Sequence, residues 1–396
     1  MTVRPLKKNL FFTLALLGLL SLSGCSGLSD IKTSITETMF GREPVDPPEP
    51  LVEYTPTRTA KILWNINIGE GDGYDFTPAV EAGVAYATSA KGDIVKIDIA
   101  KGAEIWRIKT NEKITAGVGV GGGLVLVGAA NGTVLAFDVA GKALWKSRLS
   151  SEVLSAPQYF DGTVVVRTND SRIYGINADD GSRKWVYERT SPTLSLRSSA
   201  GVVIDSGAVY AGFAGGKLIS IRADNGKLLW EASVAQPKGV TEIERIADIT
   251  SMPVVDGPLV YAVAYQGRIA AVDRVSGRIV WNRDISSLAG LYADAAKIFV
   301  SHTIGSVYSL DYTTGKTFWR QAELKNRNLT APVSVSDLVA VGDLEGYIHF
   351  LNREDGAQAA RISTDKSQVM PRLIKLAEDT LLAQTKDGGL YAIQVK

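Results

Sequence analysis

Apolar and polar residues alternate in short runs along most of the chain, and glycines or short polar turns separate the runs. The stretch 305–319, GSVYSLDYTTGKTFW, shows the unit in full. Its residues 307–310 alternate with the period of two that is typical of a strand buried on at least one face. The connection from Asp311 to Gly315 predicts a hairpin turn, in which a short side chain bonds to the local backbone and the glycine takes a positive φ. A second strand, which carries Trp319, completes the predicted pair.

The same unit recurs along the sequence and keeps its tryptophan in one position. Close variants that end in tryptophan occupy residues 92–106, 132–145, 171–185, 216–230 and 267–281. A seventh copy, 346–360, keeps the turn but has Ala360 in place of the tryptophan, and an eighth is split between 389–394 and 61–64. All seven tryptophans of the chain therefore occupy this position, at 64, 106, 145, 185, 230, 281 and 319.

Another pair of strands precedes each unit, as residues 77–80 and 83–88 illustrate, so each repeat contains four strands. Consecutive tryptophans are 38 to 51 residues apart, close to the period of about 40–50 residues in propeller blades. One blade cannot bury both faces, so neighbours must stack around an axis, and the split copy lets an N-terminal strand complete the last blade. We therefore predict an all-β, eight-bladed β-propeller with four-stranded blades over residues 60–396, its last blade closed by the N-terminal strand.

Residues 1–24 have the features of a targeting segment. Three basic residues precede an apolar stretch of 11 residues, 10–20, which is too short to span a bilayer. The sequence Leu-Ser-Gly-Cys at 22–25 follows and resembles the lipobox of bacterial lipoproteins, and Cys25 is the only cysteine of the chain. This resemblance implies that 1–24 is a lipoprotein signal peptide and that Cys25 is lipidated. The alternative is an ordinary secretory signal with an incidental cysteine.

Residues 25–59 are predicted to form the lipidated N-terminus and a proline-rich tether. Acylation of Cys25 with more than one chain would give stable membrane attachment. The residue after Cys25 is Ser26 and not the aspartate that resembles an inner-membrane retention signal. This difference favours the periplasmic side of the outer membrane. The segment has five prolines between residues 44 and 56 and few apolar residues, so it is not expected to fold alone.

The charge balance argues against nucleic acid as a partner. Removal of the three basic residues of the signal segment leaves 40 basic against 42 acidic residues, whereas nucleic-acid binding usually requires a basic surface. A single cysteine also excludes a disulfide within the chain. Stability must therefore come from the core, for which an apolar content of 45% is sufficient.

Two connections between repeats are longer than the others. One runs from Trp185 to about Gly201 and the next from Trp230 to Pro253. Because both join equivalent strands of consecutive repeats, we expect them to lie side by side on one face. Long loops on a rigid scaffold often carry function.

The first of these insertions has the pattern of a protein-docking segment. If it is extended, Leu194 and Leu196 point to one side and Arg197 to the other, which would present two apolar anchors and one guanidinium to a partner. The second insertion contains the acidic residues Glu242, Glu244 and Asp248. These could orient the arginine or meet a basic partner. The alternative is that the leucines pack back onto the propeller and that the charges form a solvated rim.

No group of residues in the sequence has the pattern of a catalytic, cofactor-binding or metal-binding site. The two histidines, His302 and His349, lack the further ligands of a metal site and are interpreted as structural. The glycine-rich stretch 117–123 leads into a strand, so we interpret it as a turn between strands and not as a phosphate loop. The repeats resemble those of pyrroloquinoline-quinone dehydrogenases, but the adjacent cysteines of those enzymes have no counterpart. Such a quinoprotein enzyme is the alternative to a protein without catalytic activity or cofactor.

The lipobox, the tether, the eight quinoprotein-like repeats and the two insertions together resemble the BamB family of outer-membrane protein assembly factors. The resemblance covers essentially the whole chain and is most specific in residues 192–197, PTLSLR, and 246–253, IADITSMP. It implies a non-catalytic scaffold that aids the insertion of β-barrel proteins and binds the POTRA repeats of BamA, and through BamA the other BAM subunits. Nascent β-barrel chains could also bind directly, at an exposed blade edge.

The resemblance also implies which residues contact BamA. They are Leu194, Leu196, Arg197 and Asp248. The family usually has a second aspartate where this chain has Thr250, so part of the acidic contact differs.

Overall fold

The computed structural model describes residues 46–190 and 192–396. The chain divides into a first unit, Met1–Pro47, and a second unit, Pro48–Lys396. The predicted signal peptide 1–24, Cys25 and the tether up to residue 45 lie outside the described residues. All strands of the described residues belong to the second unit.

The second unit consists of eight four-stranded sheets, numbered here as blades 1 to 8 in chain order. Blade 1 comprises β2 (Ala79–Glu81), β3 (Val84–Thr88), β4 (Asp93–Asp98) and β5 (Ala103–Lys109). Blade 2 comprises β6 (Ile114–Gly121), β7 (Leu124–Ala129), β8 (Thr133–Asp138) and β9 (Ala143–Arg148). Blade 3 comprises β10 (Gln158–Phe160), β11 (Thr163–Arg167), β12 (Ile173–Asn177) and β13 (Arg183–Tyr187). Blade 4 comprises β14 (Val202–Asp205), β15 (Ala208–Phe213), β16 (Lys217–Arg222) and β17 (Leu228–Ser233).

The other four blades repeat this order of strands. Blade 5 comprises β18 (Val254–Asp256), β19 (Leu259–Val263), β20 (Ile269–Asp273) and β21 (Ile279–Arg283). Blade 6 comprises β22 (Gly290–Asp294), β23 (Lys297–Ser301), β24 (Val307–Asp311) and β25 (Thr317–Gln321). Blade 7 comprises β26 (Val333–Val335), β27 (Leu338–Gly342), β28 (Tyr347–Asn352) and β29 (Gln358–Ser363). Blade 8 comprises β30 (Ile374–Ala377), β31 (Thr380–Gln384), β32 (Gly389–Val395) and β1 (Ala60–Asn67).

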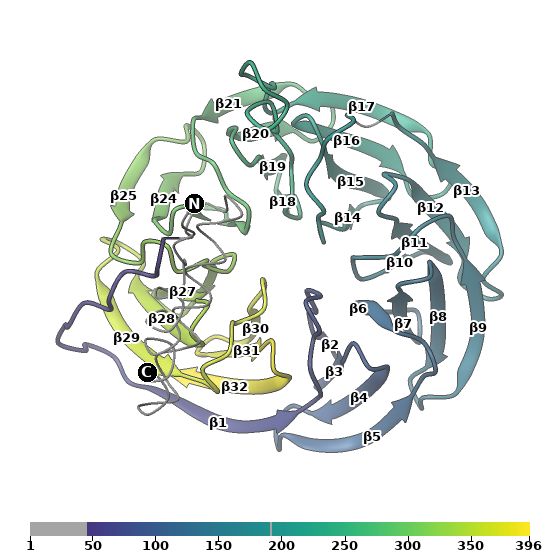
Figure 1. Ribbon diagram of the computed structural model, residues 1–396, viewed down its shortest axis with the longest axis horizontal. Helices are drawn as coiled ribbons and strands as arrows, with labels where there is room; N and C mark the ends of the chain where they lie inside the picture. Colours follow the sequence, from purple (N-terminus) through teal and green to yellow (C-terminus); the bar gives the residue numbers. More distant parts are fainter. Residues whose placement is uncertain (1–45, 191) are drawn as a thin grey trace, which may run out of the picture. The chain divides into compact units, whose positions relative to one another are not determined.

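The blades form a ring with the first strand of each blade nearest the axis (Figure 1). The outermost strand of blade 8 is β1, which pairs antiparallel with β32 from Ala60–Val395 to Asn67–Gly389. The structure therefore confirms the eight-bladed β-propeller and its closure by the N-terminal strand. Among residues 46–190 and 192–396, no helix is long and apolar enough to cross a membrane.

The hydrophobic core lies between adjacent blades. Tyr210 and Leu218 of blade 4, for example, pack in one cluster with Val260 and Ala270 of blade 5. Inner strands such as β19, LVYAV, are apolar and buried at every position, so a blade presents apolar side chains on both faces and is stabilised by the two blades that flank it.

Each tryptophan joins its own blade to the next one. The indole N–H of Trp281 donates to the carbonyl oxygen of Tyr312, 3.2 Å away in the turn between β24 and β25. The other six tryptophans make the equivalent bond at 2.7 to 3.2 Å. A Cβ on Gly315 would lie 2.5 Å from the Trp281 ring, so glycine is required for this contact. The repeated tryptophans and glycines therefore form the scaffold.

The turn between β24 and β25 has the predicted geometry. Asp311 Oδ1 accepts hydrogen bonds from the amides of Thr313 and Thr314, at 3.1 and 2.7 Å. Gly315 has a φ of 66°, which is strained for residues with a side chain. The short acidic residue and the glycine thus fix the hairpin together.

Blade 7 lacks the tryptophan because blade 8 lacks the turn that it would contact. In blade 8 the outer strand β1 precedes β32 in the sequence, so no hairpin turn joins these two strands. The amides of Thr57 and Arg58 donate to the carbonyl oxygen of Ala359 instead, at 3.0 and 3.1 Å. Ala359 and Ala360 are buried, so the chain that leads into β1 covers the position that a tryptophan occupies elsewhere.

Residues 48–59, which the sequence assigns to the tether, are part of the second unit and lie along blade 7. We call them the N-terminal strap. The carbonyl oxygen of Glu49 accepts from Arg327 at 2.8 Å, and that of Val52 accepts from Arg361 at 2.8 Å. The compact unit therefore begins at Pro48, whereas the sequence placed the start of the propeller at residue 60.

Most of the glycine-rich stretch 117–123 is strand, which corrects the expectation of a turn. Residues up to Gly121 belong to β6, and only the next two form the turn to β7. A Cβ on Gly119 would lie 1.9 Å from the carbonyl oxygen of Pro157 in the link to blade 3. Glycine is required here so that the two backbones can approach.

The connections of the ring emerge on two faces. Because the strands of each blade are antiparallel, the links between blades and the turns between second and third strands lie on one face, which we call the loop face. Residues 188–201 join β13 to β14, and residues 234–253 join β17 to β18. Both long insertions therefore belong to the loop face, and we call them the 188–201 loop and the 234–253 loop.

Candidate docking site

The two long loops are in direct contact. The Leu196 amide donates to Asp248 Oδ2 at 2.7 Å, and the Ser198 hydroxyl donates to the Thr250 carbonyl oxygen at 3.0 Å. These bonds confirm that the loops lie side by side. Residues 194–198 are consequently held against residues 248–250.

Asp248 connects the 188–201 loop to the turn between β15 and β16. Its side chain is only 4% exposed, and its second oxygen accepts from the Gly215 amide at 3.0 Å. A buried carboxylate that accepts backbone hydrogen bonds fixes the conformation of the segments that donate them. Asp248 therefore positions the backbone of Leu196, in contrast to the expectation that it orients Arg197.

Leu194, Leu196 and Arg197, which we call the docking patch, differ in exposure. Leu194 is 42% exposed, Leu196 is half-buried and Arg197 is exposed. Arg197 Nη2 donates to Glu152 Oε2 at 2.9 Å, and its guanidinium carbon lies 5.2 Å from the centre of the Tyr74 ring. The hydrogen bond to Glu152 raises the pKa of Arg197. These contacts hold a permanent positive charge in one place beside two leucines.

Glu152 is the acidic partner that sequence reasoning missed. It lies in the link 149–157 between β9 and β10, which is the same type of connection as the two long loops. That shared position in the repeat is the signal that could have placed Glu152 on the loop face. Glu244, which the sequence offered either to orient the arginine or to meet a basic partner, accepts from the amides of Val240 and Thr241 in its own loop, at 2.8 and 3.1 Å.

The 234–253 loop adds apolar surface that the sequence analysis did not single out. Val240 is 96% exposed and Ile243 is 67% exposed. Thr250, in the position of the family aspartate, donates its hydroxyl to the Leu288 carbonyl oxygen at 3.2 Å. Thr250 thus connects the loop to the link that precedes blade 6.

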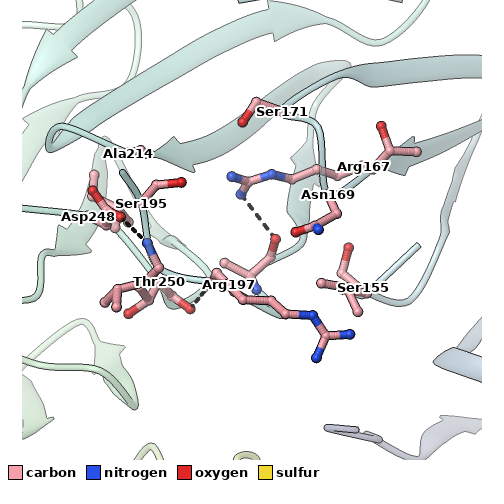
Figure 2. A pocket seen from close by; sticks show the side chains of 15 residues that line it. Ser155, Arg167, Asn169, Ser171, Ser195, Arg197, Ala214, Asp248 and Thr250 are labelled. Atoms are coloured by element: carbon pink, nitrogen blue, oxygen red, sulfur yellow. Dashed lines mark hydrogen bonds between the residues drawn. The ribbon is translucent and has the colours of Figure 1, made fainter. Parts of the chain in front are cut away.

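A polar cavity of about 190 Å³ borders the docking patch, and Leu196, Arg197 and Asp248 are among its lining residues. Figure 2 shows Arg167, at the end of β11, pointing toward the 188–201 loop. Its Nη1 donates to the Ala200 carbonyl oxygen at 3.0 Å, and its guanidinium lies 4.6 Å from the Phe213 ring. Burial lowers the pKa of Arg167 to about 10, which nearby Asp248 partly offsets. The guanidinium thus stays charged at neutral pH and stabilises the 188–201 loop through its hydrogen bond to Ala200.

Both histidines have contacts that suit a structural role. His302 Nδ1 accepts from the Ile304 amide at 3.1 Å. His349 Nε2 lies 2.9 Å from Asp343 Oδ2, and the same carboxylate accepts from Arg327 at 2.7 Å. Within the described ranges, no group of three or more His, Cys, Asp or Glu side chains is arranged to hold a metal ion.

Fold and site together define a repeat β-propeller in which two long blade-to-blade loops contact each other on the loop face. A family model described as "Outer membrane protein assembly factor BamB" matches residues 90–321 and 303–396. The protein of that name from Nitrosomonas eutropha is 40% identical over 96% of this chain and 93% of its own length. The one from Bordetella pertussis is 38% identical over 96% and 95%. The chain therefore belongs to the BamB family of outer membrane protein assembly factors, which confirms the resemblance.

Solved structures agree with this assignment. The crystal structure of BamB from Moraxella catarrhalis has a TM-score of 0.78 at 28% identity and covers 85% of this chain and 100% of its own. The quinohemoprotein alcohol dehydrogenase from Comamonas testosteroni has a TM-score of 0.66 at 13% identity, over 85% of this chain and 76% of its own. At that identity the likeness to the dehydrogenase is one of fold alone, and it lends no support to the alternative of a quinoprotein enzyme.

Proposed function

We propose that the protein is a non-catalytic scaffold of the outer-membrane β-barrel assembly machinery, which binds the POTRA repeats of BamA and thereby aids the folding and insertion of β-barrel proteins. One observation carries the proposal. The docking patch presents two leucines and a fixed arginine on a backbone that Asp248 holds in place.

The physical reason is that the patch is ordered before a partner arrives. Leu196 is anchored through its amide, and Arg197 is held by Glu152 and Tyr74. Ordering a flexible side chain at an interface costs about 0.5–1.5 kcal/mol, and here that cost is largely met within the free protein. Arginine is also among the residues that dominate the binding energy of many protein interfaces.

The anchor completes the proposal. Lipidation of Cys25 would attach the chain to the periplasmic side of the outer membrane. Because the compact unit begins at Pro48, about 22 residues separate it from Cys25. A flexible segment of that length has an average span on the order of 25 Å, so the propeller would remain near the membrane that its partner occupies.

The double variant Leu196→Asp and Arg197→Glu tests the docking patch. It introduces an unpaired carboxylate and reverses the fixed charge, so we expect binding to a purified POTRA fragment of BamA to weaken by about 100-fold or more. The unfolding temperature should stay within a few degrees, because Arg197 is exposed and Leu196 is only half-buried. Affinity is measured by calorimetric titration and stability by thermal unfolding.

A matched control makes the same chemical changes elsewhere, with Leu144→Asp on the outer strand β9 and Arg278→Glu in the β20–β21 turn. Both residues are exposed, and neither belongs to the loop face. The control should bind the POTRA fragment like the unaltered protein. Equal affinity of the docking-patch variant and the control would contradict the proposed site.

A further inference from the structure

The axis of the ring holds a second hollow, which opens beside the docking patch. Its volume is about 550 Å³, and all eight blades or the links that precede them contribute to its wall. Leu196, Arg197 and Ser198 line this hollow as well as the cavity behind the patch. We call it the channel mouth. A partner that covers the patch would therefore also cover part of the channel mouth.

Arg372 reaches across the channel mouth. It lies in the link that precedes β30 of blade 8, and its Nη1 donates to the sulfur of Met252, 2.8 Å away in the link that precedes β18 of blade 5. Blades 6 and 7 separate these two blades in the ring, so the side chain bridges links that lie three blades apart. A thioether sulfur is only a weak acceptor for a guanidinium.

The surroundings leave the charge of Arg372 uncompensated. Among the residues that the structure describes, no carboxylate lies within 4.0 Å of its guanidinium. Burial lowers the pKa of Arg372 even though the side chain keeps some exposed surface in the channel. A charge removed from water without a counterion costs several kcal/mol, so this arginine destabilises the unbound protein.

The other charged groups of the channel mouth already have partners. Asp75 accepts from the Ser199 hydroxyl at 2.7 Å, and Arg197 is paired with Glu152. The charged residues that line the channel mouth are therefore one aspartate and two arginines, of which Arg372 lacks an acidic partner within the described chain. The complementary ligand is a carboxylate, which a guanidinium can bind through two parallel hydrogen bonds.

We propose that the channel mouth receives a carboxylate side chain of the protein that docks on Leu196 and Arg197, and that Arg372 binds it. This inference rests on the proposed function, because it names a second contact of the same partner. Continuity of the two surfaces favours an acidic side chain of the docked protein over a free anion. A docked protein would also exclude water from the channel mouth, which strengthens a charge pair formed there.

The variant Arg372→Met tests the inference, because it keeps an unbranched side chain of similar length and removes the charge. Binding of the mature protein to the POTRA fragment of BamA should weaken by at least about tenfold. The unfolding temperature of the free protein should stay the same or rise, since the variant removes an uncompensated buried charge. A role confined to the fold predicts the opposite, with a lower unfolding temperature and unchanged affinity, and would overturn the proposal.

Two further variants sharpen the comparison. Arg372→Lys keeps the charge without the two parallel donors and should retain part of the affinity that Arg372→Met loses. Arg278→Met, in a hairpin turn away from the loop face, makes the same chemical change as Arg372→Met and should leave both affinity and stability unchanged. If Arg278→Met weakens binding as much as Arg372→Met, overall charge explains the effect and the proposal fails.

A charge-neutralising scan of the POTRA fragment identifies the ligand group. Each of its Asp or Glu residues is changed to Asn or Gln and titrated against the unaltered protein and against Arg372→Met. The proposal requires one acidic residue whose loss weakens binding to the unaltered protein by about tenfold but has no further effect on Arg372→Met. The absence of such a residue overturns it.

Free formate and sulfate serve as probes for the other source of an anion. If millimolar formate or sulfate raises the unfolding temperature of the unaltered protein but not that of Arg372→Met, while both proteins bind the POTRA fragment equally, the site belongs to a small anion and the docked-carboxylate proposal is wrong. These results are separable from failure of the proposed function. If the proposed function fails, the unaltered protein itself does not bind the POTRA fragment.

Discussion

His349, Asp343 and Arg327 form a buried row of hydrogen bonds between blade 7 and the N-terminal strap. All three side chains are at most 1% exposed, and Arg327 continues the row to the carbonyl oxygen of Glu49. Burial raises the pKa of Asp343, but hydrogen bonds from His349 and Arg327 outweigh this effect and the pKa is lowered. Burial lowers the pKa of His349, although Asp343 opposes this change.

The lowered pKa of His349 predicts a loss of stability in mild acid. An unfolded histidine titrates near pH 6.5, so below that pH the unfolded state binds a proton that the folded state resists, and the free energy of unfolding falls. The unfolding temperature should therefore be lower at pH 5.0 than at pH 7.5. In the variant His349→Gln this difference should be smaller, which thermal unfolding at the two pH values will show.

His302 provides the comparison for this experiment. Burial and the charge of Arg320 also lower its pKa, but it is less buried than His349. The variant His302→Gln should therefore reduce the pH dependence less than His349→Gln does. Asp343 contributes little in this range, because its stabilising effect is lost only as the pH falls below its ordinary value of 3.8 toward its folded-state pKa. Equal pH dependence in all three proteins would contradict the assignment.

The N-terminal strap replaces a repeated feature of the propeller. Seven tryptophans each bond to the hairpin turn of the following blade, whereas in blade 7 the strap bonds to Ala359 where such a turn is lacking. The small residue at 360 is therefore a consequence of ring closure and not a random loss. This exception explains why the seventh copy of the repeat differs from the others.

A tryptophan at position 360 should consequently destabilise the protein. Ala360→Trp forces a large ring against the strap, and overpacking of this kind costs about 1–3 kcal/mol. The control Leu229→Trp places the same ring on the outer strand β17, where the residue is 50% exposed, and should cost little. Denaturant unfolding measures both. If Ala360→Trp is as stable as the control, the strap does not occupy the tryptophan position.

The elements of the propeller could be predicted because they repeat. The period of two, the turn from Asp311 to Gly315 and the position of the tryptophans each recur often enough to define strands and blades from the sequence alone. The strap could not be predicted, since it is held by hydrogen bonds from Arg327 and Arg361 to its backbone. Such bonds leave no pattern in the sequence of the segment that accepts them.

The candidate docking site was predictable in part for the same reason. Leu194, Leu196, Arg197 and Asp248 lie in two neighbouring long loops, and loop length is visible in the sequence. Glu152 and Arg372 lie in short links of other blades and reach the site only through the curvature of the ring. Contacts across an axis depend on the closed ring, and no local pattern encodes them.

At the scale of the whole molecule, the pairing of β1 with β32 closes the ring. Eight blades that each contact two neighbours have no terminal repeat, so none requires a polar outer cap. Loss of β1 would expose the edge of β32 and remove the indole of Trp64 from the turn of blade 1. Both effects act at the junction between the last and the first blade.

A chain that lacks residues 60–67 should therefore fail to form a closed propeller. We expect a broad unfolding transition at lower temperature and binding of a dye that reports exposed apolar surface. A chain that begins at Asp46 is the control and should unfold like the mature protein, because the compact unit begins at Pro48. Calorimetry checks both, and a sharp transition at the usual temperature in the first chain would contradict a role of β1 in closure.

The same closure sets an order of events during biosynthesis. Of the strands that the structure describes, β1 is made first and its partner β32 last. β1 therefore stays unpaired until β32 has been made. Completion of the toroid thus requires both strands, and a product terminated before β32 keeps two open edges that proteases and chaperones can recognise.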